Sequence, residues 1–403
     1  MLKGNAIVGQ SGGPTSVINA SLAGVVDGAR DVPGIRHVYG MRWGIEGFMA
    51  GNLIDLSAEP AETIDALRRT PSSALGSSRH KVKEPDFPLI LQRLKEFNVR
   101  YFFLIGGNDT MDTIHRVTAY ANSQGYDLIG VGVPKTVDND LFGTDHTPGY
   151  GSAARYVALS ALEAGRLARD MQRVDQFVIY QSIGRDAGWL TAAAALAKRS
   201  EADAPHLVYL PERVFDRDRF LADVEQAHKQ YGYVSIFCGE GIKYADGTPV
   251  SASQTRDKFA NVEYGAMGGS SVAMNLHRMI ADRFGWRGEF QITESLCMCA
   301  IDRAVTLDLD EAYACGREAA RLAGQGQGGV MVTLVRESNA PYRSTTGTAP
   351  LADVAVRAKP MPDAFINEAG NMPTEAFVEY LRPLVGPLPE FADLNYVPAR
   401  AGQ

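Results

Sequence analysis

The sequence predicts an α/β protein with largely parallel sheets. Short apolar runs alternate with longer segments of helical spacing along most of the chain. Residues 101–105 (Tyr-Phe-Phe-Leu-Ile) and 128–133 (Leu-Ile-Gly-Val-Gly-Val) are two such runs, and glycine or proline follows each. Apolar runs of this length that glycine or proline bounds indicate buried parallel strands. Because a helical segment, 111–124, lies between them, the order is strand, helix, strand, which is typical of the α/β class.

The remaining elements follow the same alternation. Further strands are expected where apolar and β-branched residues cluster, at 5–9, 37–39, 177–180, 207–210 and 233–237. Further helices are expected where apolar residues recur at helical spacing, at 17–30, 62–69, 88–97, 152–170, 192–197 and 217–230. Residues 338–350 are rich in serine, threonine, proline and glycine, which predicts a loop. Residues 351–397 are expected to form a helical extension.

Length and composition narrow the class of protein. A chain of 403 residues exceeds one ordinary core, so roughly two domains are expected. The net charge of -7 argues against a nucleic-acid partner, and no run approaches the ~18 apolar residues of a membrane span. Few residues precede the first strand, which leaves no room for a signal peptide. The four cysteines lack C-x-x-C spacing, so we expect reduced thiols, no zinc and a cytoplasmic location.

A polar loop follows each of the predicted strands at 101–105 and 128–133. Residues 106–110 (Gly-Gly-Asn-Asp-Thr) and 134–140 (Pro-Lys-Thr-Val-Asp-Asn-Asp) come directly after the apolar runs. In an open α/β sheet, loops at the carboxyl ends of the strands form the binding crevice. That crevice would receive two glycines, a lysine and three aspartates. Such a set suits an anionic phosphate-bearing substrate with Mg²⁺, and a carboxylate base that acts on a hydroxyl.

Two other loops are candidates for phosphate binding. Residues 10–16 (Gln-Ser-Gly-Gly-Pro-Thr-Ser) join a strand to a helix, where backbone N–H groups and the helix dipole favour an anion. This loop fits neither the P-loop nor the dinucleotide pattern, and a tight turn that needs glycine explains it equally well. Residues 75–79 end in Arg79, which can grip phosphate with two hydrogen bonds, although an isolated surface arginine is usually only solvated.

Together these segments resemble the phosphofructokinases, and specifically their pyrophosphate-dependent branch. The resemblance runs from about residue 5 to 397. It rests on residues 10–15, 75–79, 106–110, 134–140, 183–189, 203–206 and 239–241. It implies two Rossmann-like three-layer α/β/α lobes plus a helical C-terminal extension. The larger, donor-binding lobe would comprise residues 1–142 with 293–337, the smaller sugar-binding lobe residues 143–292, and the loop and helical extension residues 338–403.

The resemblance also implies residue roles around the sugar. Asp138 would be the general base that takes the proton from the sugar hydroxyl. Thr136 and Asp140 would hold that substrate and the magnesium environment. Glu240 would bind sugar hydroxyls. An element that contacts the sugar and the transferring phosphate matches Ile183, Gly184 and Arg185, with isoleucine in place of the usual methionine.

On the donor side, the resemblance assigns the phosphoryl donor to Gly12, Gly13, Arg79 and Gly107. ATP-using relatives have glycine at the position of Asp109, and a carboxylate there adds bulk and like charge beside the α-phosphate. Lys135 can neutralise the smaller anion, so the two residues together favour pyrophosphate. Because Asn108 replaces an acidic residue that many relatives use near magnesium, Asp109 is expected to contact the metal directly. Lys135 and Arg185, with Mg²⁺, would supply the charge neutralisation that phosphoryl transfer needs.

One segment departs from the family pattern. Relatives that phosphorylate fructose 6-phosphate carry an arginine for the sugar's 6-phosphate, and the corresponding residue here is Glu294. A carboxylate facing a phosphate would weaken binding. Either Arg287 or Arg303 takes over, or the acceptor is another sugar, sugar phosphate or polyol; a local misalignment is the third explanation.

The leading hypothesis is therefore a pyrophosphate-dependent 6-phosphofructokinase acting on the 1-hydroxyl of fructose 6-phosphate. The alternatives are a kinase of another acceptor and a non-catalytic paralogue that binds phosphate ligands, against which the intact segment 136–140 argues. Relatives are usually homodimers or homotetramers, which sets the same expectation here.

Overall fold

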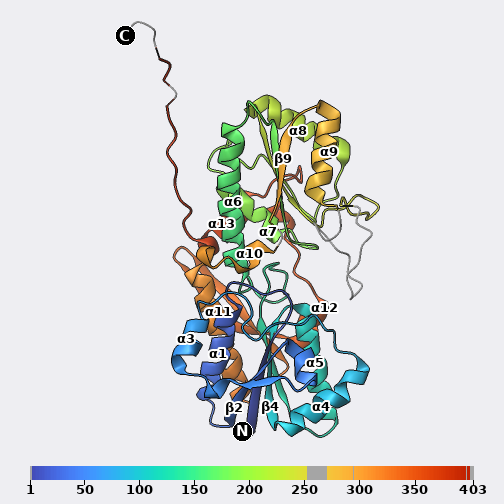
Figure 1. Cartoon of the computed structure of the whole chain (residues 1–403), viewed down its shortest axis with the longest axis vertical. Helices are drawn as coiled ribbons and strands as arrows, with labels where there is room; N and C mark the ends of the chain where they lie inside the picture. Colours follow the sequence, from blue (N-terminus) through green and yellow to red (C-terminus); the bar gives the residue numbers. More distant parts are fainter. Residues whose placement is uncertain (1, 252–269, 294, 396, 400–403) are drawn as a thin grey trace.

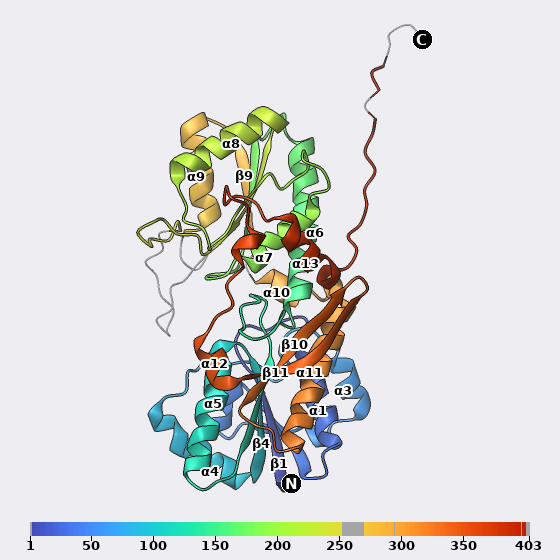
Figure 2. The same ribbon diagram turned by 180° about the vertical axis from the view of Figure 1, so that it is seen from behind.

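The structure, a computed structural model, describes residues 2–251, 270–293, 295–395 and 397–399. Two lobes lie one above the other, and each has a sheet between layers of helices (Figures 1 and 2). The α/β class and the two three-layer lobes are confirmed.

The larger lobe is built on a sheet of order β11-β10-β5-β4-β1-β2-β3. Its central strands are parallel, whereas β3 and β11 run antiparallel to their neighbours. The strands are β1 (Gly4–Gln10), β2 (Ile35–Met41), β3 (Leu53–Asp55), β4 (Val99–Gly106), β5 (Ile129–Pro134), β10 (Val330–Asn339) and β11 (Tyr342–Pro350). The centre of the sheet is covered on both faces, which explains why β4 is an almost continuous apolar run.

Helices cover both faces of this sheet. One face packs against α1 (Ile18–Arg30), α3 (Ala61–Leu67) and α11 (Thr306–Gly324). The other packs against α2 (Gly44–Met49), α4 (Phe87–Glu96), α5 (Asn108–Ser123) and α12 (Leu351–Val356).

The smaller lobe has a parallel sheet of order β7-β8-β6-β9. Its strands are β6 (Phe177–Ser182), β7 (Leu207–Tyr209), β8 (Val234–Gly239) and β9 (Gly288–Ile292). One face packs against α8 (Arg217–Tyr231) and α9 (Val272–Phe284). The other packs against α6 (Tyr150–Asp170), α7 (Trp189–Ala192), the 3-10 helix η3 (Ala193–Ala197) and α13 (Glu375–Val385). Two short elements, α10 (Leu296–Cys299) and the 3-10 helix η5 (Ile301–Arg303), follow β9.

The prediction of a loop at residues 338–350 is wrong. These residues are the end of β10, a tight turn and the whole of β11. Because β11 is an edge strand, its alternate residues face solvent, so it needs few apolar side chains and its threonines provide β propensity instead. The sheet of the larger lobe therefore continues to Pro350. The domain boundaries themselves stay a prediction.

The predicted helical extension is only partly helical. Beyond Pro350 the chain forms α12, the 3-10 helix η6 (Asp363–Phe365) and α13. Residues 386–395 and 397–399 have neither helix nor strand, and this segment projects away from the lobes (Figure 1). The predicted helix at 192–197 is the short pair α7 and η3. Within the part of the chain that the structure describes, no helix has the length and apolar character needed to cross a membrane.

Candidate active site

The loop after β5 carries the densest set of predicted site residues. Lys135 is buried, and its Nζ donates a hydrogen bond to the carbonyl oxygen of Gly13 at 2.7 Å. The backbone N–H of Asp138 donates to Oγ1 of Thr136 at 3.1 Å, which closes a local turn. The next residue, Asn139, has φ 56°, a left-handed conformation that asparagine tolerates better than most residues. The sequence Thr-Val-Asp-Asn-Asp thus forms a tight turn that fixes the direction of the Asp138 backbone.

Charges from both lobes act on the carboxylate of Asp138. Burial and the nearby carboxylate of Glu240 raise its pKa, while Lys135 and Arg185 oppose that rise. Burial, together with Asp138, likewise raises the pKa of Asp140 to about 6. Burial lowers the pKa of Lys135 to about 8, against the pull of the two aspartates. This combination of a carboxyl group with raised basicity and flanking cations suits proton removal from a hydroxyl beside an anion.

The smaller lobe supplies the opposite wall. The N–H of Gly184 donates to Oε1 of Glu240 at 3.2 Å, and Nε of Arg185 lies 4.0 Å from the same oxygen. Gly184 has φ 129°, and a Cβ there would lie 2.7 Å from the carbonyl oxygen of Ala187, so glycine is required. Ile183 is partly buried against the core of the smaller lobe. Loops after β6 and β8 thus present Arg185 and Glu240 to the loop after β5.

On the donor side, each predicted glycine has a different structural reason. Gly12 has φ 75° and its N–H donates to the carbonyl oxygen of Ser78. A Cβ on Gly13 would lie 2.4 Å from Cε of Met298, whereas one on Gly107 would meet nothing within 4 Å. Gly13 therefore makes room for a side chain, and Gly107 borders open space that a ligand can approach. Arg79 is exposed, and its charge contributes to the lowered pKa of Lys135.

Asp109 lies apart from the buried carboxylates. It is in the first turn of α5 with a side chain 75% exposed, and Oδ2 is 3.0 Å from Nζ of Lys81. The sequence did not predict this pairing, because nothing marks Lys81 except its position two residues after Arg79. Among the described residues, no group of three or more histidine, cysteine, aspartate or glutamate side chains is arranged to hold a metal ion. The assignment of Asp109 to the metal stays a prediction.

The structure describes Arg287 and Arg303, the two arginines proposed to bind the sugar's 6-phosphate in place of the residue at position 294. Glu294 lies outside the described residues. Arg287 precedes β9, at the opposite end of the sheet from Gly184, and pairs with Asp175 at 3.1 Å. Arg303 pairs with Glu163 and donates to Oγ of Ser160.

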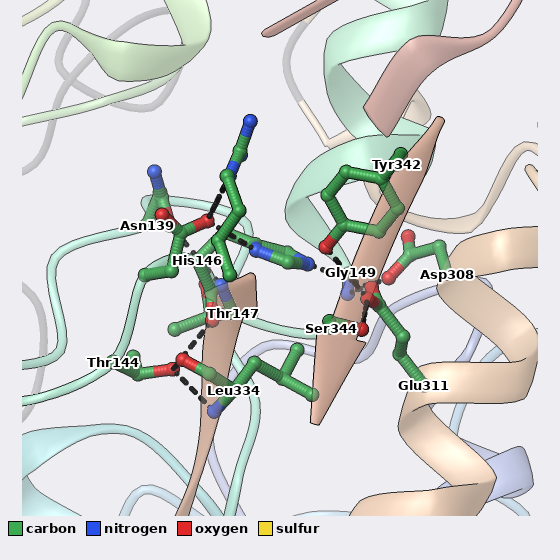
Figure 3. A network of polar contacts seen from close by, with 12 residues as sticks. Asn139, Thr144, His146, Thr147, Gly149, Asp308, Glu311, Leu334, Tyr342 and Ser344 are labelled. Atoms are coloured by element: carbon green, nitrogen blue, oxygen red, sulfur yellow. Dashed lines mark hydrogen bonds and ion pairs between the residues drawn. The ribbon is translucent and has the colours of Figure 1, made fainter. Parts of the chain in front are cut away.

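Residues 135–149, between β5 and α6, are called the catalytic loop below after their proposed role, and a buried polar network anchors their second half (Figure 3). The ring of His146 lies between two carboxylates, with Nδ1 2.8 Å from Asp145 and Nε2 2.7 Å from Glu311. Tyr342 and Ser344 of β11 donate to the other oxygen of Glu311. Burial would lower the pKa of His146, but the hydrogen bonds to Asp145 and Glu311 outweigh it and raise that pKa. The two carboxylates therefore favour the cationic form of the histidine, which joins the loop to α11 and, through Glu311, to β11.

Sequence reasoning missed the side chains that reach the site from distant segments. Met298 of α10 lies against Gly13, and the charge of Asp138 acts on the thiol of Cys297. Lys359 and Tyr380, from the C-terminal extension, contact Asn139. The unusual run Cys297-Met298-Cys299 was the one available signal; a lone lysine or tyrosine far along the chain carries none.

Two facing α/β lobes, with an aspartate, a lysine and an arginine between glycine loops, define a phosphotransferase. The chain belongs to the phosphofructokinase family, whose sequence pattern matches residues 5–293.

The similarity to individual members extends over nearly the whole chain. The chain is 41% identical to the pyrophosphate–fructose 6-phosphate 1-phosphotransferase of Halomonas elongata, over 96% of this chain and 92% of the relative. It is 32% identical to a sulfofructose kinase of Alkalicoccus urumqiensis, over 94% of each chain. The crystal structure of a pyrophosphate-dependent phosphofructokinase from Marinobacter aquaeolei matches with a TM-score of 0.86 at 36% identity, covering 97% of this chain and 94% of that one.

Proposed function

We propose that the protein transfers a phosphoryl group from pyrophosphate to the 1-hydroxyl of fructose 6-phosphate, with Mg²⁺. The observation that carries this proposal is the position of the Asp138 carboxyl group between two cations of opposite lobes. Lys135 and Arg185 both lower its pKa, against the rise that burial causes. The similarity to the Halomonas elongata phosphotransferase supports the choice of donor and acceptor.

Each residue has a distinct task in this proposal. Asp138 accepts the proton of the attacking hydroxyl. Lys135 and Arg185 offset the negative charge of the transferring phosphoryl group, which is the main demand of this reaction. Glu240 and Gly184 orient the sugar, together with Ile183, Thr136 and Asp140. Gly12, Gly13, Gly107 and Arg79 surround the pyrophosphate.

The residues fit a magnesium ion. Burial raises the pKa values of Asp138 and Asp140, and a neighbouring carboxylate adds to the rise in each case, Glu240 for Asp138 and Asp138 for Asp140. A cation at this loop would relieve that repulsion. Mg²⁺ is commonly held by one or two carboxylates together with substrate phosphates. Asp140 is the carboxylate of this loop that would hold it, and Asp109, at the start of α5, is the second candidate ligand. When bound, the ion would neutralise charge on the phosphates.

A donor and acceptor screen tests this function. Purified protein with Mg²⁺ is assayed for phosphorylation of fructose 6-phosphate, with either pyrophosphate or ATP as donor. We expect turnover with pyrophosphate, and nuclear magnetic resonance of the product should place the new phosphate on C1. Failure with both donors at substrate concentrations of several times the usual KM range, roughly 1 μM–1 mM, would contradict the proposal.

Glu294 and the similarity to a sulfofructose kinase favour a second candidate function. In this alternative the pyrophosphate-dependent reaction is the same, but the acceptor carries a different anionic group or none at that end. The same screen, extended to sulfofructose, unphosphorylated sugars and polyols, separates the two. A higher kcat/KM for one of these than for fructose 6-phosphate would establish the second candidate.

We further propose a homodimer or homotetramer in the cytoplasm, as the family resemblance implies. Sedimentation of the purified protein measures the assembly state, and a monomer at micromolar concentration would contradict it.

A further inference from the structure

The segment between α12 and η6 crosses the junction of the two lobes (Figure 2). It contains an isolated antiparallel bridge between Ala358 and Leu141, which lies in the catalytic loop directly after Asp140. Lys359 is the next residue of this segment. The family pattern ends at residue 293, so nothing in that pattern assigns a role to it.

Lys359 makes a dense set of contacts with the catalytic loop. Its backbone N–H donates to the carbonyl oxygen of Asp140 at 2.6 Å. Its Nζ donates to Oδ1 of Asn139 at 3.2 Å, and to the carbonyl oxygens of Thr144 and Asp145 at 3.2 and 2.7 Å. An ammonium group has three protons, so these acceptors use all of its donors. Lys359 thus holds both ends of the segment 139–145.

Lys359 also contacts the other lobe. Its carbonyl oxygen accepts a hydrogen bond from Nε1 of Trp189 at 3.2 Å, and its Nζ lies 4.9 Å from the centre of that ring. Trp189 ends the segment that begins with Ile183 and includes Arg185. One residue therefore joins the loop that carries the proposed base to the loop that carries the proposed arginine.

Tyr380 of α13 reinforces the same point. Its hydroxyl accepts from Nδ2 of Asn139 at 3.1 Å and donates to the carbonyl oxygen of Asp145 at 2.9 Å. Asn139 also accepts from the N–H of Thr147 at 3.1 Å. The left-handed residue next to Asp138 is thus held by Lys359, Tyr380 and Thr147, and such a conformation persists where its surroundings determine it.

We propose that Lys359 is a positioning residue for phosphoryl transfer, which ties the loop of Asp138 to the loop of Arg185 across the lobe junction. The proposal rests on the proposed function. Lys359 does not touch the reacting groups; it fixes the backbone that aims them. Small errors of placement are costly in such reactions, since a displacement of about 1 Å can reduce the rate ~100-fold.

Lys359→Met tests this role, because methionine keeps the length and apolar stem but donates no hydrogen bond. We expect kcat to fall at least ~10-fold while KM for pyrophosphate changes less than ~3-fold, since the donor glycines lie on other elements. Hydrogen exchange, measured without substrates, should become faster in residues 136–149 and 183–189. Lys359→Arg, which keeps donors at this position, should recover part of the lost kcat.

Lys198→Met is the matched control. The Nζ of Lys198 also donates to three backbone carbonyls, those of Glu201, Asp203 and Pro205 at 2.6, 2.8 and 3.4 Å, in the smaller lobe. This variant should lose thermal stability without the loss of kcat. Equal effects of both variants on kcat and on melting temperature would reduce Lys359 to a structural role and overturn the proposal.

Two further measurements keep the test decisive. If Lys359→Met does not fold, Tyr380→Phe takes its place, because it removes both hydrogen bonds to the loop but keeps the ring, and it should also lower kcat more than KM. An unchanged kcat in Tyr380→Phe would then overturn the proposal. If the wild-type protein transfers no phosphate at all, the proposed function fails, and hydrogen exchange in residues 136–149 decides separately whether Lys359 holds the loop.

Discussion

At the scale of single residues, Asp138 is buried, and charges from both lobes act on its carboxyl group. Lys135, Arg185, Glu240 and Asp186 all influence its pKa, and they come from both lobes. A general base contributes ~10²–10⁴-fold to such reactions. We predict that Asp138→Ala lowers kcat by that factor, while pyrophosphate affinity, measured by calorimetry, changes little. A loss of kcat below about fivefold would exclude Asp138 as the base, since it would be smaller than the contribution of a general base.

The donor prediction concerns Asp109. Its carboxylate is exposed at the start of α5 and paired with Lys81. In the proposed site it would place bulk and negative charge beside the phosphoryl donor. We predict that Asp109→Gly raises the ratio of ATP-dependent to pyrophosphate-dependent kcat/KM. Asp112→Gly, on the same helix and paired with Arg116 at 3.6 Å, is the control and should leave the ratio unchanged. A wild-type protein that uses ATP at least as well as pyrophosphate would show that the charge argument is wrong.

The acceptor prediction concerns Glu294. Loss of a charge-assisted contact costs ~1.5–3 kcal/mol, which corresponds to roughly ten- to a hundredfold in affinity. Fructose 6-phosphate should therefore bind more weakly than in relatives with the arginine, and Glu294→Arg should tighten it. Low-micromolar affinity in the wild type, unchanged or weakened by the substitution, would return the chain to an ordinary phosphofructokinase with a rearranged anion site.

At the scale of elements, the β10–β11 hairpin and α11 are joined to the catalytic loop through His146, which pairs with Glu311, and through Thr144, which accepts from the N–H of Leu334 (Figure 3). Burial would lower the pKa of His146, but the hydrogen bonds to Asp145 and Glu311 outweigh it and raise the folded pKa above its unfolded value of about 6.5. Below that unfolded value both states are protonated and the stabilisation is fully present. It is lost as the pH rises through the folded pKa, because the unfolded state releases its proton first.

The two carboxylates of this network have the opposite dependence. Burial raises the pKa of Asp145 and Glu311, but hydrogen bonds from His146, and also from Arg336 to Asp145, outweigh it and lower both values. Their contribution is present above their unfolded pKa values of about 4 and is lost as the pH falls through the folded ones. The network is therefore most stabilising between about pH 4 and 6.5.

We predict that His146→Gln reduces the free energy of unfolding more at pH 6 than at pH 9, as measured by urea denaturation. His206→Gln is the control, because burial lowers the pKa of His206 to about 4. A depressed histidine pKa removes stability as the pH falls, so the gap between wild type and His206→Gln should shrink toward low pH. The same pH trend in both variants would contradict the charge assignment of His146.

At the scale of the whole molecule, the site exists because two lobes face each other. The carboxyl ends of β4 and β5 supply the loops with Asp109 and Asp138, and those of β6 and β8 supply Arg185 and Glu240. The chain beyond Pro350 then returns across the junction and packs α13 against the smaller lobe. Early in that return, Lys359 contacts the loop of Asp138 through Asn139, and Trp189 at the end of the segment of Arg185.

The sequence by itself determined the α/β class, the order of most helices and strands, and the loops that meet between the lobes. These features depend on local signals, since apolar runs, glycines and the Thr-Val-Asp-Asn-Asp segment lie close together in the chain. The family resemblance then named the chemistry, and the comparisons agree with it.

Only the tertiary structure decided what supports those loops. Residues 342–350 form the strand β11 because β10 lies beside them to pair with, although the composition of 338–350 is that of a loop. Met298 lies against Gly13, Glu311 against His146, and Lys359 against Asn139, although each pair is more than a hundred residues apart. Such contacts have no local sequence pattern, because burial and hydrogen bonding at a distance depend on how the lobes pack.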